Sequence, residues 1–179
     1  MADKTKYGKH ILRNAFKKHH QMEGLSASGD EMDADCILTH HIFFKPEYVL
    51  KESHYHDDFM QILCFLGTNP DDVRDFGGAV IELCLGKEEE KHIIDSPVIV
   101  PLPKGMPHGP LNFKKLPKPV IFLEIMLTRK YHSNLLPPPG AMIPGAKPTA
   151  KKSKPADKAK KTAKAETKPA TKARAKARK

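Results

Sequence analysis

The stretch HYHDDFMQILCFLG, residues 54–67, decides how this chain folds, together with PKGMPHGPLN at residues 103–112. Alternate residues of a strand point to the same side of a sheet, so His54 and His56 are expected to face one interior. Imidazole nitrogens and a carboxamide oxygen suit a borderline divalent metal ion. The two segments therefore predict one metal site inside a barrel. Its candidate ligands are His54, His56, Gln61 and His108.

Short apolar runs follow one another between residues 37 and 127. They are rich in Val, Ile, Leu and Phe, and clusters of Gly, Pro, Asn and Asp such as GTNPDD separate them. Seven such runs, with no convincing helix between them, predict an all-β sandwich or barrel. Several runs, among them PVIFLEIML at residues 119–127, are apolar on both alternating faces, which is the pattern of strands packed between two layers.

The two segments resemble the paired motifs of the cupin family, Gly-x5-His-x-His-x3-4-Glu-x6-Gly and Gly-x5-Pro-x-Gly-x2-His-x3-Asn. The matching residues are His54 and His56, with Gly67 one position early, and then Pro103, Gly105, His108 and Asn112. The resemblance covers residues 37–127. It implies an all-β fold, the cupin-type double-stranded β-helix or jelly-roll barrel, with a single metal ion at its centre and often a homodimer.

Three positions depart from the cupin pattern. Tyr48 and Pro97 stand where the motifs begin with Gly, and Gln61 stands where the usual ligand is Glu. A neutral carboxamide can coordinate a metal, but it leaves the site one negative charge short, which makes the metal a stronger Lewis acid. Cupins with Gln at this position resemble the uronate-linearising enzymes of pectin breakdown and certain polyketide cyclases, which polarise a carbonyl group or enolise a substrate.

The resemblance therefore favours a metal-dependent isomerase, cyclase or lyase that acts on a small carbonyl- or carboxylate-bearing substrate. Its cofactor would be one divalent transition metal ion: Mn, Fe, Ni or Zn. Two alternatives stay open. One is a metal-dependent dioxygenase, and the other is a non-catalytic cupin that binds a small ligand and is tethered to nucleic acid by a basic tail. We lean towards an enzyme.

Two acidic residues interrupt apolar strands, Glu82 in AVIELCL and Glu124 in PVIFLEIML. An unpaired buried carboxylate is costly, so each lies either at a solvated edge or in a functional cavity. In a cavity, desolvation would favour the neutral carboxyl group, and both residues are therefore candidate catalytic acids or bases. An ion pair with a lysine is the simpler alternative for each.

The basic character of the chain belongs to its C-terminal end. Residues 147–179 hold fourteen Lys and Arg against two acidic residues, a net charge of +12, whereas the rest of the chain has a net charge of −2. This segment has almost no residues able to form a core, so we expect a disordered tail. Its composition resembles the tails of linker histones, and its charge predicts weak, non-specific nucleic-acid binding, with a merely solubilising tail as the alternative.

These patterns divide the chain into four segments. They are an N-terminal arm and loop (1–36), the barrel (37–136), a Pro-rich linker (137–146) and the tail (147–179). The three cysteines show no CxxC spacing, which indicates reduced thiols in the cytoplasm. No stretch has the length of a signal peptide's apolar core or a membrane span, so we expect a cytoplasmic protein with no membrane partner. From the resemblance to cupins we expect a small-molecule substrate.

Overall fold

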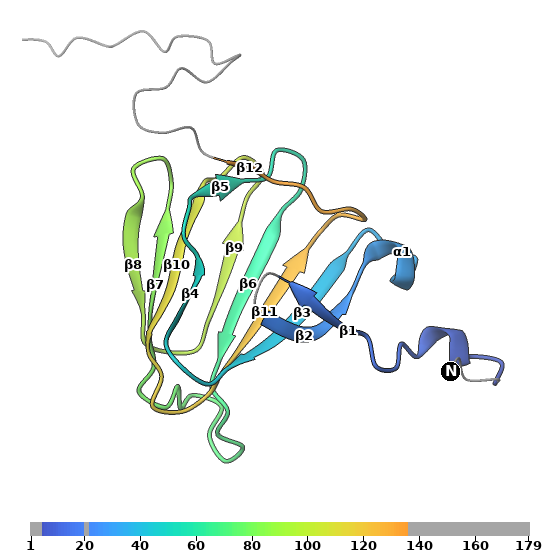
Figure 1. The fold of residues 1–179 in the computed structure, drawn as a ribbon, viewed down its shortest axis with the longest axis horizontal. Helices are drawn as coiled ribbons and strands as arrows, with labels where there is room; N and C mark the ends of the chain where they lie inside the picture. Colours follow the sequence, from blue (N-terminus) through green and yellow to red (C-terminus); the bar gives the residue numbers. More distant parts are fainter. Residues whose placement is uncertain (1–4, 20–21, 136–179) are drawn as a thin grey trace, which may run out of the picture. The chain divides into compact units, whose positions relative to one another are not determined.

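Two antiparallel β-sheets face each other in the computed structural model of this chain, which describes residues 5–19 and 22–135 (Figure 1). The first sheet contains, in spatial order, β1 (Phe16–His19), β2 (Met22–Ala27), β3 (Ile37–Phe43), β11 (Val120–Met126), β6 (Gln61–Leu66) and β9 (Val98–Leu102). The second contains β12 (Asn134–Leu135), β5 (His54–Tyr55), β10 (His108–Lys115), β7 (Val80–Leu85) and β8 (Glu90–Ile94), and β4 (Glu47–Leu50) also pairs with β10.

The strand pairs join segments that are distant in the sequence. In the first sheet β11 lies between β3 and β6, and in the second β10 lies between β5 and β7. All of these pairs are antiparallel. This order, in which the chain winds from one sheet to the other, is that of a double-stranded β-helix, so the predicted fold class is confirmed.

Three strands of the second sheet, β5, β10 and β12, have no counterpart among the seven apolar runs of the sequence. Both β5 and β12 have only two residues, and the sequence of β10 begins HGP. Gly109 and Pro110 interrupt the apolar pattern at the start of β10, although the strand is central in its sheet. Apolar periodicity therefore missed the two strands that carry the histidine motifs.

The N-terminal segment contains more regular structure than the expected arm and loop. It contributes β1 and β2 to the first sheet, with Leu25 opposite His40 of β3, and it also holds a 3-10 helix (Gly8–His10) and the short α1 (Gly29–Met32). A capping box between Ser28 and Glu31 starts α1. Small inward side chains such as Ser26 hid β2 from an apolar pattern.

An aromatic cluster holds the two sheets together. Phe43, Phe65 and Phe122 reach it from the first sheet and Phe113 reaches it from the second, and all four are buried. The rings of Phe43 and Phe113 stack with centroids 4.1 Å apart, and Phe113 meets Phe122 edge to face at 6.0 Å. Because Phe113 is the contact from the opposite sheet, it anchors one layer to the other.

None of the described helices is long and apolar enough to cross a membrane. The Pro-rich linker predicted at residues 137–146 and the tail predicted at residues 147–179 lie outside the described residues. The described strands and helices all belong to one compact unit, residues 1–142.

We predict that Phe113→Ala lowers the free energy of unfolding by about 3–5 kcal/mol, because it removes a fully buried ring and leaves a cavity between the sheets. The matched control is Phe44→Ala, because the side chain of Phe44 is 71% exposed. This substitution should change the free energy of unfolding by less than about 0.5 kcal/mol. Urea unfolding followed by circular dichroism measures both, and equal losses would contradict this account of the core.

Candidate metal centre

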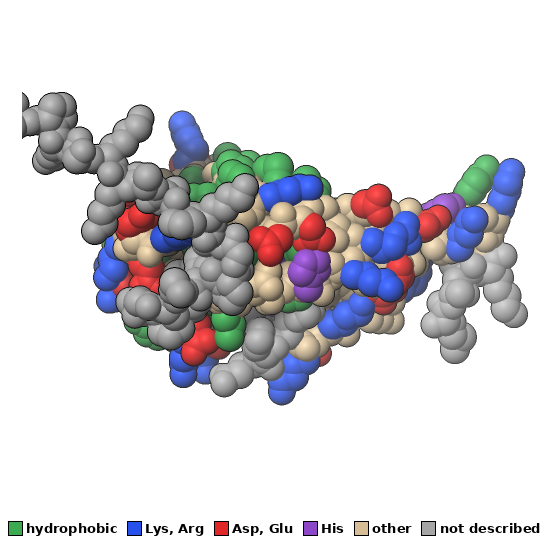
Figure 2. Space-filling model, turned by 90° about the horizontal axis from the view of Figure 1, so that it is seen from above, with side chains coloured by type: hydrophobic (Ala, Val, Ile, Leu, Met, Phe, Trp, Pro, Cys, Tyr) green, Lys and Arg blue, Asp and Glu red, His purple; other side chains and the backbone are tan. Residues whose placement is uncertain are grey.

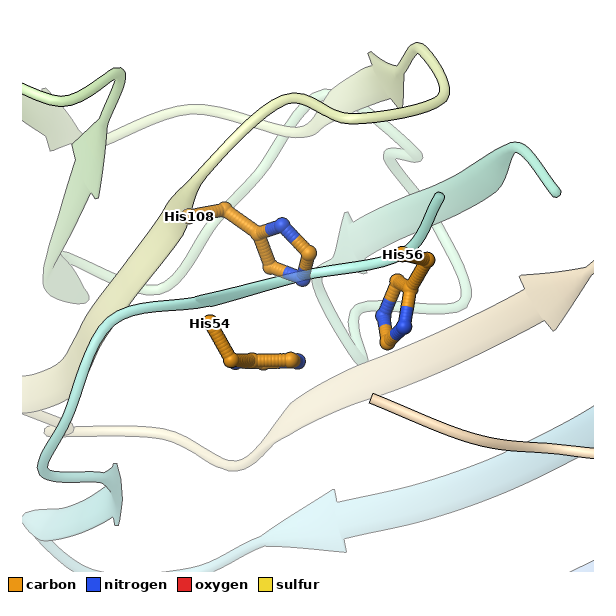
Figure 3. A group of neighbouring side chains, drawn as sticks. All are labelled: His54, His56 and His108. Carbon is orange, nitrogen blue, oxygen red and sulfur yellow. The ribbon is translucent and has the colours of Figure 1, made fainter. Parts of the chain in front are cut away.

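Three histidines meet at one end of the interface between the sheets. His54 begins β5, His56 follows that strand directly, and His108 begins β10. These two strands are antiparallel neighbours with His54 opposite His108. The alternation expected at the first motif holds, since His54 and His56 are both buried while Tyr55 between them is only partly so. The three rings turn toward one another (Figure 3).

Backbone hydrogen bonds join the two motifs. The Gly105 N–H donates to the carbonyl oxygen of His56 at 2.6 Å, and the Met106 N–H donates to that of Pro103 at 3.1 Å. Gly105 has a φ of 73°, a conformation that glycine adopts without strain, which explains the glycine of the second motif. This turn leads the chain into β10 and so places His108 beside the first motif.

Gly67 closes the first motif for a steric reason. A Cβ atom at this position would lie 1.9 Å from the carbonyl oxygen of Asp75, so only glycine fits at the end of β6. The close approach lets the segment after β6 pack tightly against the strand end.

The three imidazoles are close enough to share one ion. The ring centroids of His54 and His108 lie 4.2 Å apart, and the ring of His56 lies 4.9 Å from the first and 5.1 Å from the second. One nitrogen of each ring lies within 4.8 Å of the other two. Imidazole nitrogens bind a metal at about 2.0–2.1 Å, so two of them on one ion are at most about 4.2 Å apart.

Hydrogen bonds to backbone carbonyls fix which nitrogens are free. His56 Nδ1–H donates to the carbonyl oxygen of His132 at 2.8 Å, and His108 Nδ1–H donates to that of Met106 at 3.0 Å. A carbonyl only accepts, so these nitrogens carry the proton and each Nε2 keeps a lone pair. His108 Nε2 and His54 Nδ1 are buried without a hydrogen-bond partner among the described residues. The buried lone pair of His108 Nε2 fits a bound cation, and the unpartnered His54 ring lies beside it.

Burial keeps the three rings neutral. It lowers the pKa of His54 to about 3, and the neighbouring His108 and His56 add to this effect. Burial also lowers the pKa of His108 to about 4 and lowers the pKa of His56. A neutral imidazole is the form that binds a metal, so the rings need lose no proton at neutral pH.

Gln61 joins the histidines from the first sheet. It begins β6, is buried, and holds its Oε1 atom 3.1 Å from Nε2 of His56. Both atoms are acceptors, because His56 carries its proton on Nδ1 and because the Gln61 amide group donates elsewhere. Two lone pairs facing each other repel, and a cation held between them would make the arrangement favourable. The structure thus brings together all four residues that the sequence indicated as ligands.

Glu124 lies behind Gln61 and orients it. The Gln61 amide group donates from Nε2 to Oε1 of Glu124 at 3.1 Å, and the hydroxyl group of Thr39 donates to Oε2 at 3.1 Å. The Glu124 side chain is half-buried, and desolvation of its carboxyl group inside the barrel raises its pKa. These two hydrogen bonds hold the amide with its oxygen toward His56.

A cavity of about 250 Å³ opens beside the histidines, between the two sheets. Its wall is mainly apolar, with Leu63, Leu83 and Phe122 among the lining residues, while His54, His108, Gln61 and Glu124 line its polar end. Lys17 and Ser26 reach it from β1 and β2, and Lys17 is ion-paired with Glu31. The lining suits a small molecule with an apolar body and a polar end.

Glu82 is placed differently from Glu124. It forms ion pairs with Lys114 at 3.3 Å and Lys91 at 3.5 Å, and it does not line either described cavity that reaches His54. The lysine pairing that sequence reasoning kept as the alternative therefore describes its surroundings. Of the two acidic candidates, Glu124 alone lies beside the histidines.

Sequence reasoning did not identify the segment that closes the site after β11. The carbonyl oxygen of His132 holds His56, the His132 ring pairs with Asp58 at 2.8 Å, and Tyr131 lines the cavity. Asn134 then pairs with Tyr55 in the β5–β12 ladder. These residues are polar and lack periodicity, so no pattern marked them. Thr39, by contrast, could have been found, since it alternates with Ile37 and His41 on the inner face of β3.

No protein-family model matches the chain, and no match was found among curated proteins. Among solved structures, the chain is similar to an uncharacterised conserved protein with a double-stranded β-helix domain from Klebsiella pneumoniae. The match has 11% identity and a TM-score of 0.46, and it covers 73% of this chain and 88% of that one.

Oxalate decarboxylases are also similar. A mutant of the Bacillus subtilis enzyme shares 12% identity with a TM-score of 0.45, over 68% of this chain and 29% of that one. A formate complex of the Lactobacillus farciminis enzyme shares 10% identity with a TM-score of 0.45, over 68% and 33%. This chain thus spans about a third of the length of those decarboxylases. Identities this low leave the chemistry to be judged from the site itself.

We predict that the metal-free protein loses stability as the pH falls from about 6.5 towards 4. The pKa values of His54 and His108, about 3 and about 4, lie below that of an unfolded histidine, about 6.5, so the unfolded chain binds more protons across this window. Urea unfolding after chelation measures the slope. His108→Gln should reduce the dependence of the unfolding free energy on pH, whereas His92→Gln, at an exposed ring, should leave it unchanged. The same pH dependence in all three proteins would contradict the prediction.

Proposed function

We propose that this protein is a metal-dependent enzyme that holds one divalent transition metal ion, Mn, Fe, Ni or Zn. The ligands are His54, His56 and His108, with the amide oxygen of Gln61 as the fourth. The observation that carries the proposal is the buried group of imidazoles, two of which, His54 and His108, have nitrogens without a hydrogen-bond partner among the described residues. A structural histidine cluster would satisfy such nitrogens with protein donors.

We further propose isomerisation, cyclisation or elimination of a small substrate that carries a carbonyl or carboxylate group. When bound, the metal supplies a Lewis acid that polarises an oxygen atom of the substrate. All four ligands are neutral, so they leave the positive charge of the ion uncompensated, which favours this chemistry over oxygen activation. The apolar wall of the cavity holds the body of the substrate and excludes water from it.

Glu124 is the residue that we propose to move the proton. It is the one acidic side chain among the described residues that line the cavity, and burial raises its pKa above the ordinary value of a carboxyl group. A carboxyl group whose pKa is raised in this way is suited to accept a proton and to return it. Thr39 and Gln61 fix its position, so a proton next to a polarised carbonyl group would meet a base already in place.

The first test is metal content. We expect the wild-type protein, purified from cells without a chelating column, to hold close to one transition metal ion per chain, and His108→Ala to bind at least about 100-fold more weakly because it removes a buried ligand. The control His92→Ala removes an exposed histidine that pairs with Glu90. Equal metal content in wild type and His108→Ala would refute the ligand set. Oxygen consumption that depends on iron would instead indicate a dioxygenase.

The second test separates the two acidic candidates. Glu124→Ala removes the acceptor that orients Gln61, so we expect metal affinity to fall about 10–100-fold. Glu82→Ala, which breaks ion pairs on the other sheet, should leave the affinity unchanged. Competition with a chromogenic chelator measures both variants. Unchanged metal affinity in Glu124→Ala would remove Glu124 from the site, and a loss of affinity in Glu82→Ala would contradict the placement of Glu82 away from it.

A further inference from the structure

A basic side chain lines the cavity that opens beside the histidines. Lys17 belongs to β1, the edge strand of the first sheet, and it is the one Lys or Arg among the described residues that line this cavity. Its neighbours Phe16 and Lys18 are exposed, whereas Lys17 is half-buried. Because successive side chains of a strand point to opposite faces, Lys17 points inward from β1.

An ion pair with Glu31 holds the ammonium group of Lys17 in place. Glu31 is itself fixed at the start of α1, because its carboxylate accepts from the backbone N–H of Ser28 at 2.7 Å and from the Ser28 hydroxyl group at 2.6 Å. An ammonium group carries three donors, and Glu31 engages one of them. Donors of Lys17 therefore remain for a ligand in the cavity.

The ion pair alone would not distinguish Lys17 from other surface lysines. Both of its side chains are more than a third exposed, and pairs of this kind contribute little to stability. Side chains of both signs also lie next to one another on the face of the molecule that Figure 2 shows. An inward charge on an edge strand can serve only to discourage pairing with another chain. Lys17 differs in that its side chain lines a cavity.

Polar side chains also lie between Lys17 and the candidate metal centre. On the inner face of the first sheet, Ser26 of β2 pairs with Thr39 of β3, and Thr39 pairs with Glu124 of β11. All three line the cavity. Neighbouring strands are about 4.8 Å apart, so the backbones of Ser26 and Glu124 are about 10 Å apart. The strand of Lys17 lies one place beyond Ser26, so the cavity extends well beyond the histidines.

The wall of the cavity near these residues is apolar. Ile37, Phe122 and Met126 line it from β3 and β11, and Leu83 and Leu111 line it from the second sheet. The side chains of these five residues offer no hydrogen-bond donor and no oxygen acceptor. A ligand with two oxygen-bearing groups, separated by an apolar chain, matches this distribution of charge and apolar surface.

The charges at the Lys17 end favour a carboxylate over a phosphate. Lys17 supplies one positive charge, the buried hydroxyl group of Ser26 supplies a further donor, and Glu31 adds one negative charge nearby. A phosphate group carries about −1.5 to −2 charges at neutral pH and would meet an excess of negative charge there. A carboxylate carries a single charge, and it accepts charge-assisted hydrogen bonds from an ammonium group.

We propose that Lys17 determines substrate specificity by binding a carboxylate group of the substrate. This inference rests on the proposed function, in which the metal ion holds a different, oxygen-bearing end of the same molecule. The substrate is then a small acid in which a short apolar chain separates the carboxylate from the metal-bound oxygen atom.

Isothermal titration calorimetry on the full-length, metal-loaded protein tests the proposal. Glutarate, adipate and pimelate are compared with pentanoate, hexanoate and heptanoate, so that each pair of equal chain length differs only in the second carboxylate. We expect wild type to bind the dicarboxylate of at least one pair at least about tenfold more tightly.

Lys17→Met keeps an unbranched side chain but removes its charge. We expect this variant to lose the preference for the dicarboxylate and to bind the monocarboxylate as tightly as wild type. Because both side chains of the Lys17–Glu31 pair are partly exposed, the barrel should still fold, which circular dichroism checks.

The matched control is Lys18→Met. Lys18 is the next residue of β1, is exposed, and lies opposite Glu23 in the β1–β2 ladder, so this variant removes the same charge from the other side of the strand. It should keep the preference of wild type. The proposal would be overturned by a wild type that prefers none of the three dicarboxylates, by a preference that persists in Lys17→Met, or by equal losses in both variants.

His108→Ala separates this inference from the proposed function. A metal ion that holds one end of the ligand makes both members of a pair bind more weakly to this variant, whereas Lys17→Met weakens only the dicarboxylate. Unchanged affinities in His108→Ala, together with a lost preference in Lys17→Met, would refute the metal-dependent function and support the carboxylate site. The reverse pattern would refute the carboxylate site alone.

Discussion

The antiparallel pairing of β5 with β10 is the constraint on which the site depends. It sets His54 opposite His108, although more than fifty residues separate them in the chain. The strand contact is brief, so the turn around Gly105, which donates to the carbonyl oxygen of His56, secures the same register from the other side. The aromatic cluster around Phe113 keeps the two sheets at a fixed separation. The histidines are therefore preorganised by backbone bonds and packing rather than by contacts with one another.

Gln61 and Glu124 show how a change at one ligand position is accommodated by the neighbouring strand. The carboxylate expected at the Gln61 position is absent, but a carboxyl group lies one hydrogen bond behind it, on β11. In the proposed function, Gln61 coordinates the metal through its neutral amide and Glu124 carries the proton, so two residues share these tasks. This division suits chemistry in which a substrate oxygen is polarised while a proton moves nearby, and it accounts for the burial of an acidic side chain in an otherwise apolar strand.

The two sheets of the barrel differ in the chemistry of their outer faces. The inner faces of both build the core and the cavity, but the outer face of the first sheet is apolar and that of the second is charged. Alternating apolar residues on both faces of β3, β6 and β11 give these strands a requirement that one packed layer does not meet.

The sequence by itself determined the all-β class and the four residues around the candidate site, because strand alternation and the spacing of His54, His56, Gln61 and His108 are local properties. The double-stranded β-helix followed from the resemblance of the two motifs to those of cupins. Apolar periodicity did not mark β10, whose Gly and Pro interrupt the pattern, or β2 of the N-terminal segment. Only the tertiary structure decided that Glu124 faces the histidines while Glu82 meets two lysines. The two carboxyl groups interrupt their apolar runs in the same way, so the sequence alone does not distinguish them. The difference arises because distant strands determine which side of a strand is covered.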